Sequence, residues 1–121
     1  MFKSSILASK NTIIEENIEE FCIMVRRNNK AILGGILCEI KNESLNINTL
    51  WLHESIRGKN ISRKLIEESE IHARKNDCYF SRVSTASFQA PWLYLKLGYK
   101  KISEFKFGPH KTICYKKRLT N

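Results

Sequence analysis

The feature that most constrains this chain is an apolar strand that runs through a polar, glycine-containing turn into an amphipathic helix. Alternating and then continuous apolar residues from Leu45 to Leu52 predict a strand that is buried on at least one face. The turn spans residues 54–60, and we predict a helix over residues 61–75. A helix that starts in this way has unpaired amide groups at its first turn, which can bind an anion. The predicted apolar stripe of the helix is Ile61, Leu65, Ile66, Ser69 and Ala73, whereas Glu67, Glu68, Glu70, Arg74 and Lys75 fall on other faces.

Positive charges crowd the start of the predicted helix, at Arg57, Lys59, Arg63 and Lys64. The helix macrodipole disfavours each cation there by a few tenths to ~1 kcal/mol at low salt. A helix selected only for stability would carry acidic residues instead. The pattern therefore favours a bound polyanion such as a phosphate, and the alternative is a solvated basic turn without a ligand.

The length of 121 residues suits one domain, and a composition of 42% hydrophobic and 27% charged residues is that of an ordinary globular protein. No apolar run approaches the roughly 18 residues that cross a bilayer. The first ten residues contain too short an apolar core for a secretory signal. We therefore expect a cytoplasmic protein that does not act at a membrane.

The four cysteines are widely scattered, without a Cys-x-x-Cys pair or histidines at ligand spacing. Reduced, mostly buried thiols are expected, and neither a disulfide framework nor a metal site is predicted. The net charge of +9 is uneven, because residues 1–56 carry six Lys/Arg against seven Asp/Glu and residues 57–121 carry fifteen against five. A basic half indicates an anionic partner, which composition alone cannot identify.

The remaining pattern predicts a mixed sheet. Ile13, Ile14, Ile18 and Phe21 recur at near-helical spacing among glutamates, so we predict a short amphipathic helix capped by Asn11 or Thr12. A strand–helix–strand unit of the observed spacing favours a parallel, right-handed crossover. Strands are predicted at residues 21–25, 31–40, 45–53, 78–85, 99–107 and 112–119, with a short helix at residues 89–98 and with Gly34 and Gly35 marking a bulge or a close backbone approach.

Two segments of the chain resemble signatures of the GCN5-related N-acetyltransferase (GNAT) superfamily. The run Arg57-Gly58-Lys59-Asn60-Ile61-Ser62 is similar to the family's acetyl-CoA pyrophosphate loop, Arg/Gln-x-x-Gly-x-Gly/Ala, except that Asn60 and Ser62 replace small motif residues. The run from Ser87 to Tyr99 resembles the family segment Ala-Pro-x-x-Tyr-x-x-Leu-Gly-Phe/Tyr. The resemblance extends from Phe21 to Leu119, most of the chain.

This resemblance implies an α/β fold made of one N-acetyltransferase domain over residues 1–121. Its mixed, mostly antiparallel sheet would contain a central parallel pair of strands splayed for coenzyme A, with helices on both faces. It further implies transfer of the acetyl group of acetyl-CoA to a primary amine of a small molecule or protein, by direct attack in a ternary complex and without a metal. Catalytically silent acyl-CoA binding is the first alternative, and nucleic-acid binding by the basic half is a less favoured one.

The resemblance also assigns roles to residues. The pantetheine arm would bond to the backbone of Leu50, Trp51 and Leu52, with the Trp51 side chain expected in the core. Gln89 is a further candidate for the pantetheine, Tyr94 matches the general acid, and Glu54, His53, Glu39 or a water is the candidate base. The pyrophosphate would be held by the amides of Arg57, Gly58, Lys59, Asn60, Ile61 and Ser62.

The same resemblance leaves the acceptor side open. Relatives carry a strand and one or two helices before their second strand, and about twenty residues are available here before Phe21. We therefore expect the acceptor side to be shortened, rearranged or completed by another subunit, for example in a homodimer.

Overall fold

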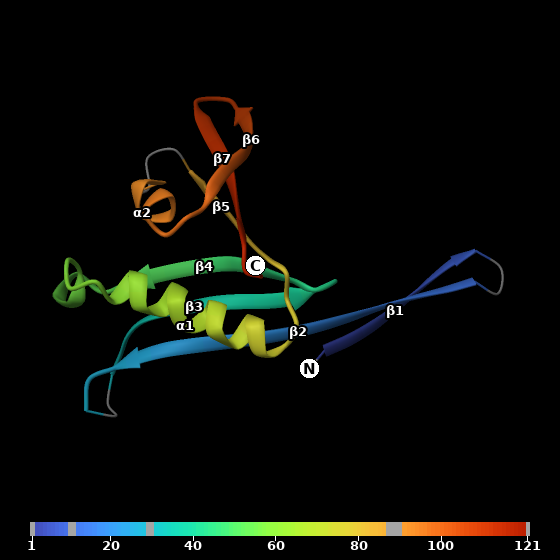
Figure 1. The fold of residues 1–121 in the computed structure, drawn as a ribbon, viewed down its shortest axis with the longest axis horizontal. Coiled ribbons are helices and arrows are strands. Elements are labelled where there is room, and N and C mark those ends of the chain that lie inside the picture. The colour runs from blue at the N-terminus through green and yellow to red at the C-terminus, as the bar shows by residue number, and fades with distance from the viewer. Residues whose placement is uncertain (1, 10–11, 29–30, 87–90, 121) are drawn as a thin grey trace.

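The computed structural model describes residues 2–9, 12–28, 31–86 and 91–120 (Figure 1). Its frame is a seven-stranded sheet in the order β1-β2-β3-β4-β5-β7-β6. The strands are β1 (Phe2–Ser9), β2 (Thr12–Arg26), β3 (Ile32–Lys41), β4 (Ser44–Leu52), β5 (Phe80–Ala86), β6 (Lys100–Phe107) and β7 (His110–Arg118), and the helices are the 3-10 turn η1 (Glu54–Ile56), α1 (Ile61–Lys75) and α2 (Pro91–Lys96). None of the helices in these ranges is long and apolar enough to cross a membrane.

The predicted mixed sheet is confirmed. Strands β2, β3 and β4 form an antiparallel meander, and β4 pairs with β5 in parallel through α1 as the crossover. β7 and β6 then continue the sheet in antiparallel order. Figure 1 shows the β5-β7-β6 half rising away from the plane of β2, β3 and β4, so that the sheet opens between β4 and β5.

The helix predicted over residues 11–21 is wrong. Asn11 lies outside the described residues, and residues 12–21 belong to β2, whose first half pairs with β1 in a hairpin with Ile14 opposite Ile6 and Ile13 opposite Leu7. β-Branched residues favour strands, and cross-strand pairing outweighs a weak helical period. The hairpin projects beyond the ends of β3 and β4 (Figure 1).

One buried cluster joins α1 and α2 to the sheet. Leu65, Ile66 and Ala73 of α1 meet Ile36 and Cys38 of β3, and the same cluster includes Tyr94 of α2. Both helices thus contribute to one core, whereas we predicted helices on both faces of the sheet. The reason is that the N-terminal segment forms strands, and on the opposite face Met24, Leu37 and Trp51 stay 43–49% exposed.

The predicted position of Glu70 outside the buried face of α1 is also wrong. The helical pattern placed this residue off the apolar stripe, but it is only 2% exposed. Its carboxylate accepts hydrogen bonds from the Tyr99 hydroxyl and from the Lys117 ammonium group, both at 2.8 Å. These partners come from β7 and from the residue just before β6, and a helical period alone gives no sign of them.

Gly34 confirms the predicted close backbone approach. A Cβ atom at this position would lie 2.7 Å from Leu52 Cδ2 and 2.8 Å from the Trp51 carbonyl oxygen, closer than real side chains tolerate. The neighbouring β3–β4 register shifts between Leu37 and Cys38, which leaves Asn48 without a partner in β3. Such a bulge bends the strand and changes which side chains face the core.

Candidate functional site

The candidate site is the gap where β4 and β5 separate. Their parallel pairing runs from Ser44–Phe80 to Ile47–Val83 and then ends. Beyond that point β4 stays paired with β3 as far as Leu52, while β5 stays paired with β7 as far as Ala86. Each strand therefore keeps one partner and presents an unpaired backbone edge to the other strand. The β4 bulge at Asn48 coincides with the end of pairing.

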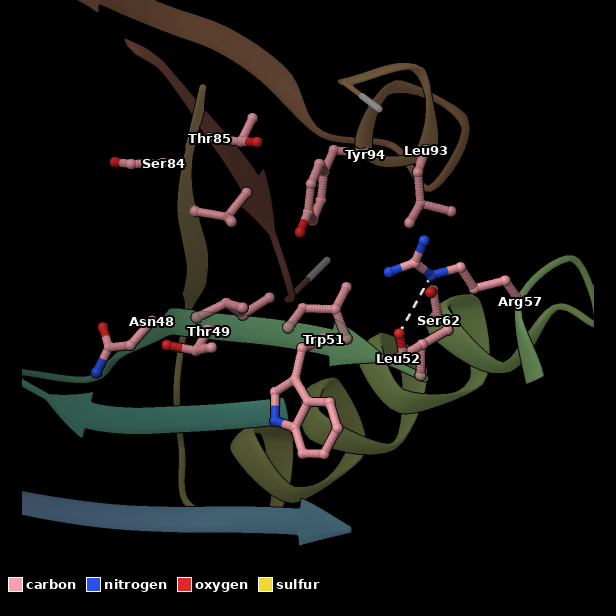
Figure 2. A pocket seen from close by; sticks show the side chains of 13 residues that line it. Asn48, Thr49, Trp51, Leu52, Arg57, Ser62, Ser84, Thr85, Leu93 and Tyr94 are labelled. Carbon is pink, nitrogen blue, oxygen red and sulfur yellow. Dashed lines mark hydrogen bonds between the residues drawn. The ribbon is translucent and has the colours of Figure 1, made fainter. Parts of the chain in front are cut away.

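A cavity of about 490 Å³ fills this gap. It combines apolar walls with hydroxyl groups and, within the described part of the chain, has one charged lining residue, Arg57. Figure 2 shows the cavity between β4 below and β5 with α2 above. The lining residues are Ile47, Asn48, Thr49, Leu50, Trp51, Leu52, Arg57, Ser62, Val83, Ser84, Thr85, Leu93 and Tyr94.

The anion-binding end of the cavity lies at the start of α1. Gly58 and Asn60 both adopt positive φ, 77° and 60°, so asparagine supports the left-handed conformation that the family motif assigns to glycine. The Asn60 side chain forms no capping bond, and the first helical bond runs from the Lys64 amide to the Asn60 carbonyl oxygen. The amides of the first turn are thus available to an anion. Ser62 in this turn lines the cavity.

Arg57 links this turn to β4. Its Nε donates a hydrogen bond of 3.1 Å to the Leu52 carbonyl oxygen, drawn as the dashed line in Figure 2. The bond holds the guanidinium group at the rim of the cavity and leaves its remaining N–H donors for a ligand. Arg63, by contrast, pairs with Glu67 at 3.0 Å on the exposed side of α1. The cations of this turn therefore differ in what they can bind.

Tyr94 forms the other wall of the cavity. Its ring packs edge-on against Tyr99 with the centroids 5.7 Å apart and stacks on Tyr115 at 6.0 Å. Figure 2 shows its hydroxyl directed toward β4, and no hydrogen bond to this hydroxyl forms within the described residues. Burial raises the pKa of Tyr94 to about 12. The cavity therefore contains a protonated phenol whose donor is free for a ligand.

Six of the predicted site residues line the cavity together, namely Leu50, Trp51, Leu52, Arg57, Ser62 and Tyr94. Gly58, Lys59, Asn60 and Ile61 lie in the adjacent turn and first helical position but are not among the lining residues. Gln89 lies outside the described residues. The Trp51 side chain was expected in the core, and this prediction is wrong. The side chain is 49% exposed and points away from Tyr94, beyond β4 (Figure 2).

The candidate bases do not line the cavity. Glu54 is exposed in η1, and the His53 ring accepts a hydrogen bond of 3.1 Å from the Ser55 amide. Glu39 pairs in register with Glu20 and Asn46, one strand away from the gap. Sequence reasoning also missed Thr49, Thr85 and Leu93. Thr49 lies inside a predicted strand, Thr85 ends another, and Leu93 lies in the predicted short helix, so no pattern in the sequence indicated that these three side chains meet at one gap.

Comparison with known proteins agrees with this geometry. Residues 19–101 match the family model of the acetyltransferase (GNAT) domain, and the chain belongs to this family. A relative, the blasticidin-S acetyltransferase of Streptomyces morookaense, is 33% identical over 70 residues, which cover 57% of this chain and about half, 52%, of the relative. Acetyltransferase Atu2258 of Agrobacterium fabrum is 27% identical over 95 residues, 78% of this chain and 68% of that protein.

A solved structure shows the same fold. The crystal structure of an acetyltransferase from Bacillus cereus is 30% identical in sequence and superimposes with a TM-score of 0.79. The superposition covers 84% of this chain and 74% of the Bacillus cereus chain. The predicted mixed sheet with a splayed parallel pair, and the assignment to the GNAT superfamily, are thereby confirmed. Within the described residues, no group of three or more His, Cys, Asp or Glu side chains could hold a metal ion.

Proposed function

We propose that this protein transfers the acetyl group of acetyl-CoA to a primary amine. The observation that carries the proposal is the open β4–β5 gap, with an uncapped helix start and Arg57 at one end and the Tyr94 hydroxyl on the facing wall. The donor set fits the cosubstrate: amides and a guanidinium group suit a pyrophosphate. The unpaired edge of residues 50–52 suits the amide groups of a pantetheine arm, as an added strand would.

The reaction needs an N–C bond to form and the C–S bond of the thioester to break. Tyr94 assists the departure of sulfur. A thiol with the ordinary pKa of ~8.5 is a much stronger acid than a phenol whose pKa is about 12. Complete proton transfer from Tyr94 to the thiolate is therefore uphill, and Tyr94 acts by donating a hydrogen bond to the developing negative charge.

The proton of the attacking amine goes to water in this proposal, because no carboxylate or imidazole lines the cavity in the described part of the chain. The rate should then follow the fraction of neutral acceptor and rise with pH until the acceptor's own pKa. Glu54→Gln separates this mechanism from one with a protein base. An unchanged pH profile supports water, and a loss of more than about tenfold assigns the base to Glu54.

Isothermal titration of acetyl-CoA with Arg57→Ala tests the anion site. We expect one-to-one binding that is about tenfold or more weaker in the variant, since a charge-assisted bond is lost. Arg63→Ala is the matched control, because Arg63 lies in the first turn of α1 but pairs with Glu67 and does not line the cavity. Equal weakening by both substitutions would indicate only the general positive field. No binding at millimolar acetyl-CoA would refute the proposal.

Tyr94→Phe tests catalysis in a thiol-release assay with a panel of amines. Loss of one hydrogen bond to developing charge should lower kcat about 10- to 100-fold and leave acetyl-CoA affinity unchanged. Tyr79→Phe is the control, because Tyr79 is 48% exposed and is not among the residues that line the cavity. Binding without any turnover would favour the second candidate, a catalytically silent acyl-CoA-binding module. The specific observation for it is that no carboxylate or imidazole is found among the cavity-lining residues that the structure describes.

A further inference from the structure

A second cavity opens on the other side of the sheet at the same gap. It measures about 430 Å³ and shares four lining residues with the first, namely Ile47, Asn48, Val83 and Ser84. Figure 2 shows why the two cavities lie on opposite sides: Thr85 leaves β5 on the side of Tyr94, and Ser84 leaves it on the other. The two cavities therefore meet through the opening between β4 and β5. Asn46, Arg82, Ile102, Ser103, Cys114 and Tyr115 complete the second lining.

Arg82 is the one residue that carries a charge among the described residues that line this second cavity. It lies two positions before Ser84 on β5, about 6.6 Å along the strand. No ion pair with Arg82 is formed within the described residues, and its side chain is exposed. Asparagine and serine side chains around it are neutral donors and acceptors. The cavity thus offers a planar cation beside the gap.

The pairing register places Arg82 in a row of charges that sheet stability does not explain. Residues directly paired across β5, β7 and β6 are Arg82, Lys116 and Lys100. Like charges directly opposite one another destabilise a sheet. Lys116 is partly satisfied, because its ammonium group lies 3.9 Å from the Phe80 ring centroid. Arg82 makes no such contact with an aromatic ring of the described residues, and it is the member of the row that lines the cavity.

A cationic cavity without a carboxylate repels an ordinary protonated amine. An amine that also carries an acidic group would be attracted, because a guanidinium group binds carboxylate or phosphate through two parallel hydrogen bonds. We infer that the acceptor is a small amine bearing a carboxylate or phosphate, whose oxyanion Arg82 binds in the second cavity while the amine reaches the β4–β5 gap. This inference rests on the proposed acetyl transfer and names its acceptor class.

The acceptor series is built from linear ω-amino acids from glycine to 6-aminohexanoate, each compared with its own carboxamide. Aminoethyl phosphate distinguishes phosphate from carboxylate. We expect kcat/KM for the best acid to exceed that for its amide by about tenfold or more, with an optimum length set by the spacing between Arg82 and the gap. Each acid and amide is assayed with the wild type and with Arg82→Gln, so that the intrinsic reactivity of the amines cancels in the ratio.

Arg82→Gln should lower kcat/KM for acids about 10- to 100-fold, leave the amides unchanged, and leave acetyl-CoA affinity unchanged in titration calorimetry. Lys100→Gln is the matched control, since it removes a cation from the same row but does not line the cavity. Equal use of acid and amide by the wild type, or an acid preference that survives Arg82→Gln, would overturn the inference. So would acetyl-CoA binding combined with turnover of the amides but of none of the acids.

Failure of the proposed function itself gives a different result. In that case acetyl-CoA does not bind, or no amine in the series is acetylated. The oxyanion site at Arg82 is then tested by binding alone. 6-Aminohexanoate and its carboxamide are each titrated into the wild type and into Arg82→Gln, and binding is followed by NMR. Acid-selective shifts that disappear in the variant would still support an oxyanion site at Arg82, and identical titrations would refute it.

Discussion

Glu70→Gln should destabilise the protein far more than the same substitution three residues earlier. The Glu70 side chain is 3% exposed, and its carboxylate accepts from Lys117 and Tyr99 at 2.8 Å each. The Tyr99 hydroxyl in turn lies 2.6 Å from the Ser81 hydroxyl. Removing the charge leaves the Lys117 ammonium group, 21% exposed, without its counter-ion.

The magnitude follows from these contacts. Removing one partner of a buried pair costs about 3–5 kcal/mol, but the partly exposed lysine regains some hydration and the glutamine oxygen keeps one acceptor. We therefore expect a loss of about 2–3 kcal/mol. Glu67 is the matched control on the same helix: it pairs with Arg63 at side-chain exposures of 62% for the arginine and 51% for the glutamate. An exposed pair of this kind contributes about 0.3–0.5 kcal/mol.

Urea unfolding followed by circular dichroism measures both variants. Glu70→Gln should lower the midpoint while the m-value stays that of the wild type, because the surface exposed on unfolding is unchanged. A free-energy loss within about 0.5 kcal/mol of that for Glu67→Gln would show that the buried network does not stabilise the fold, and the reasoning would fail.

Three further predictions concern stability and binding. Burial raises the pKa of Cys38 from its ordinary value of 9.0 to about 11, and the pKa of Tyr94 from 10.0 to about 12. Since the unfolded chain loses these protons first, each group should lower the free energy of unfolding by ~1.4 kcal/mol per pH unit, Cys38 from pH 9 to about 11 and Tyr94 from pH 10 to about 12. In urea unfolding, Cys38→Ala should reduce this slope between pH 9 and about 11. Gly34→Ala should cost about 1–3 kcal/mol in the same assay and weaken acetyl-CoA binding, because the new methyl group displaces Leu52 at the cavity rim. Asn60→Gly should leave the free energy of unfolding and the affinity for acetyl-CoA nearly unchanged. Asn60→Val should lower the free energy of unfolding by about 1–2 kcal/mol, because the backbone at this position has a positive φ that valine does not favour.

Much of the fold could be predicted because each local pattern agreed with its neighbours. The helix over residues 61–75 has the predicted bounds, and every strand predicted from residue 31 onward is present within two residues, whereas the strand predicted at residues 21–25 is only the end of the longer β2. The N-terminal segment was misjudged because its isoleucines suit a helix face and a strand about equally. Only the pairing with residues 2–9 decides between them.

The candidate site was predictable only in part, because the β4 bulge at Asn48 changes which side chains face the core. Without a bulge, the alternation of Leu45 and Ile47 would continue to Trp51 and place this side chain on the buried face, where the tryptophan was expected. The unpaired Asn48 shifts the phase, so that Leu50 and Leu52 pack against the core and Trp51 turns outward. A single-residue bulge leaves no clear mark in the sequence.

The bulge also lies at the opening that the two cavities share. It lies at the end of β4–β5 pairing, and Asn48 lines both cavities with its neighbour Ile47 and with Val83 and Ser84 across the gap. A donor in the first cavity and an acceptor in the second can therefore meet only where these residues separate. Direct transfer between two bound substrates requires such an arrangement, because the reacting atoms must come within about 3–3.5 Å. Any change that closes the gap should abolish transfer even if both ligands still bind at their outer ends.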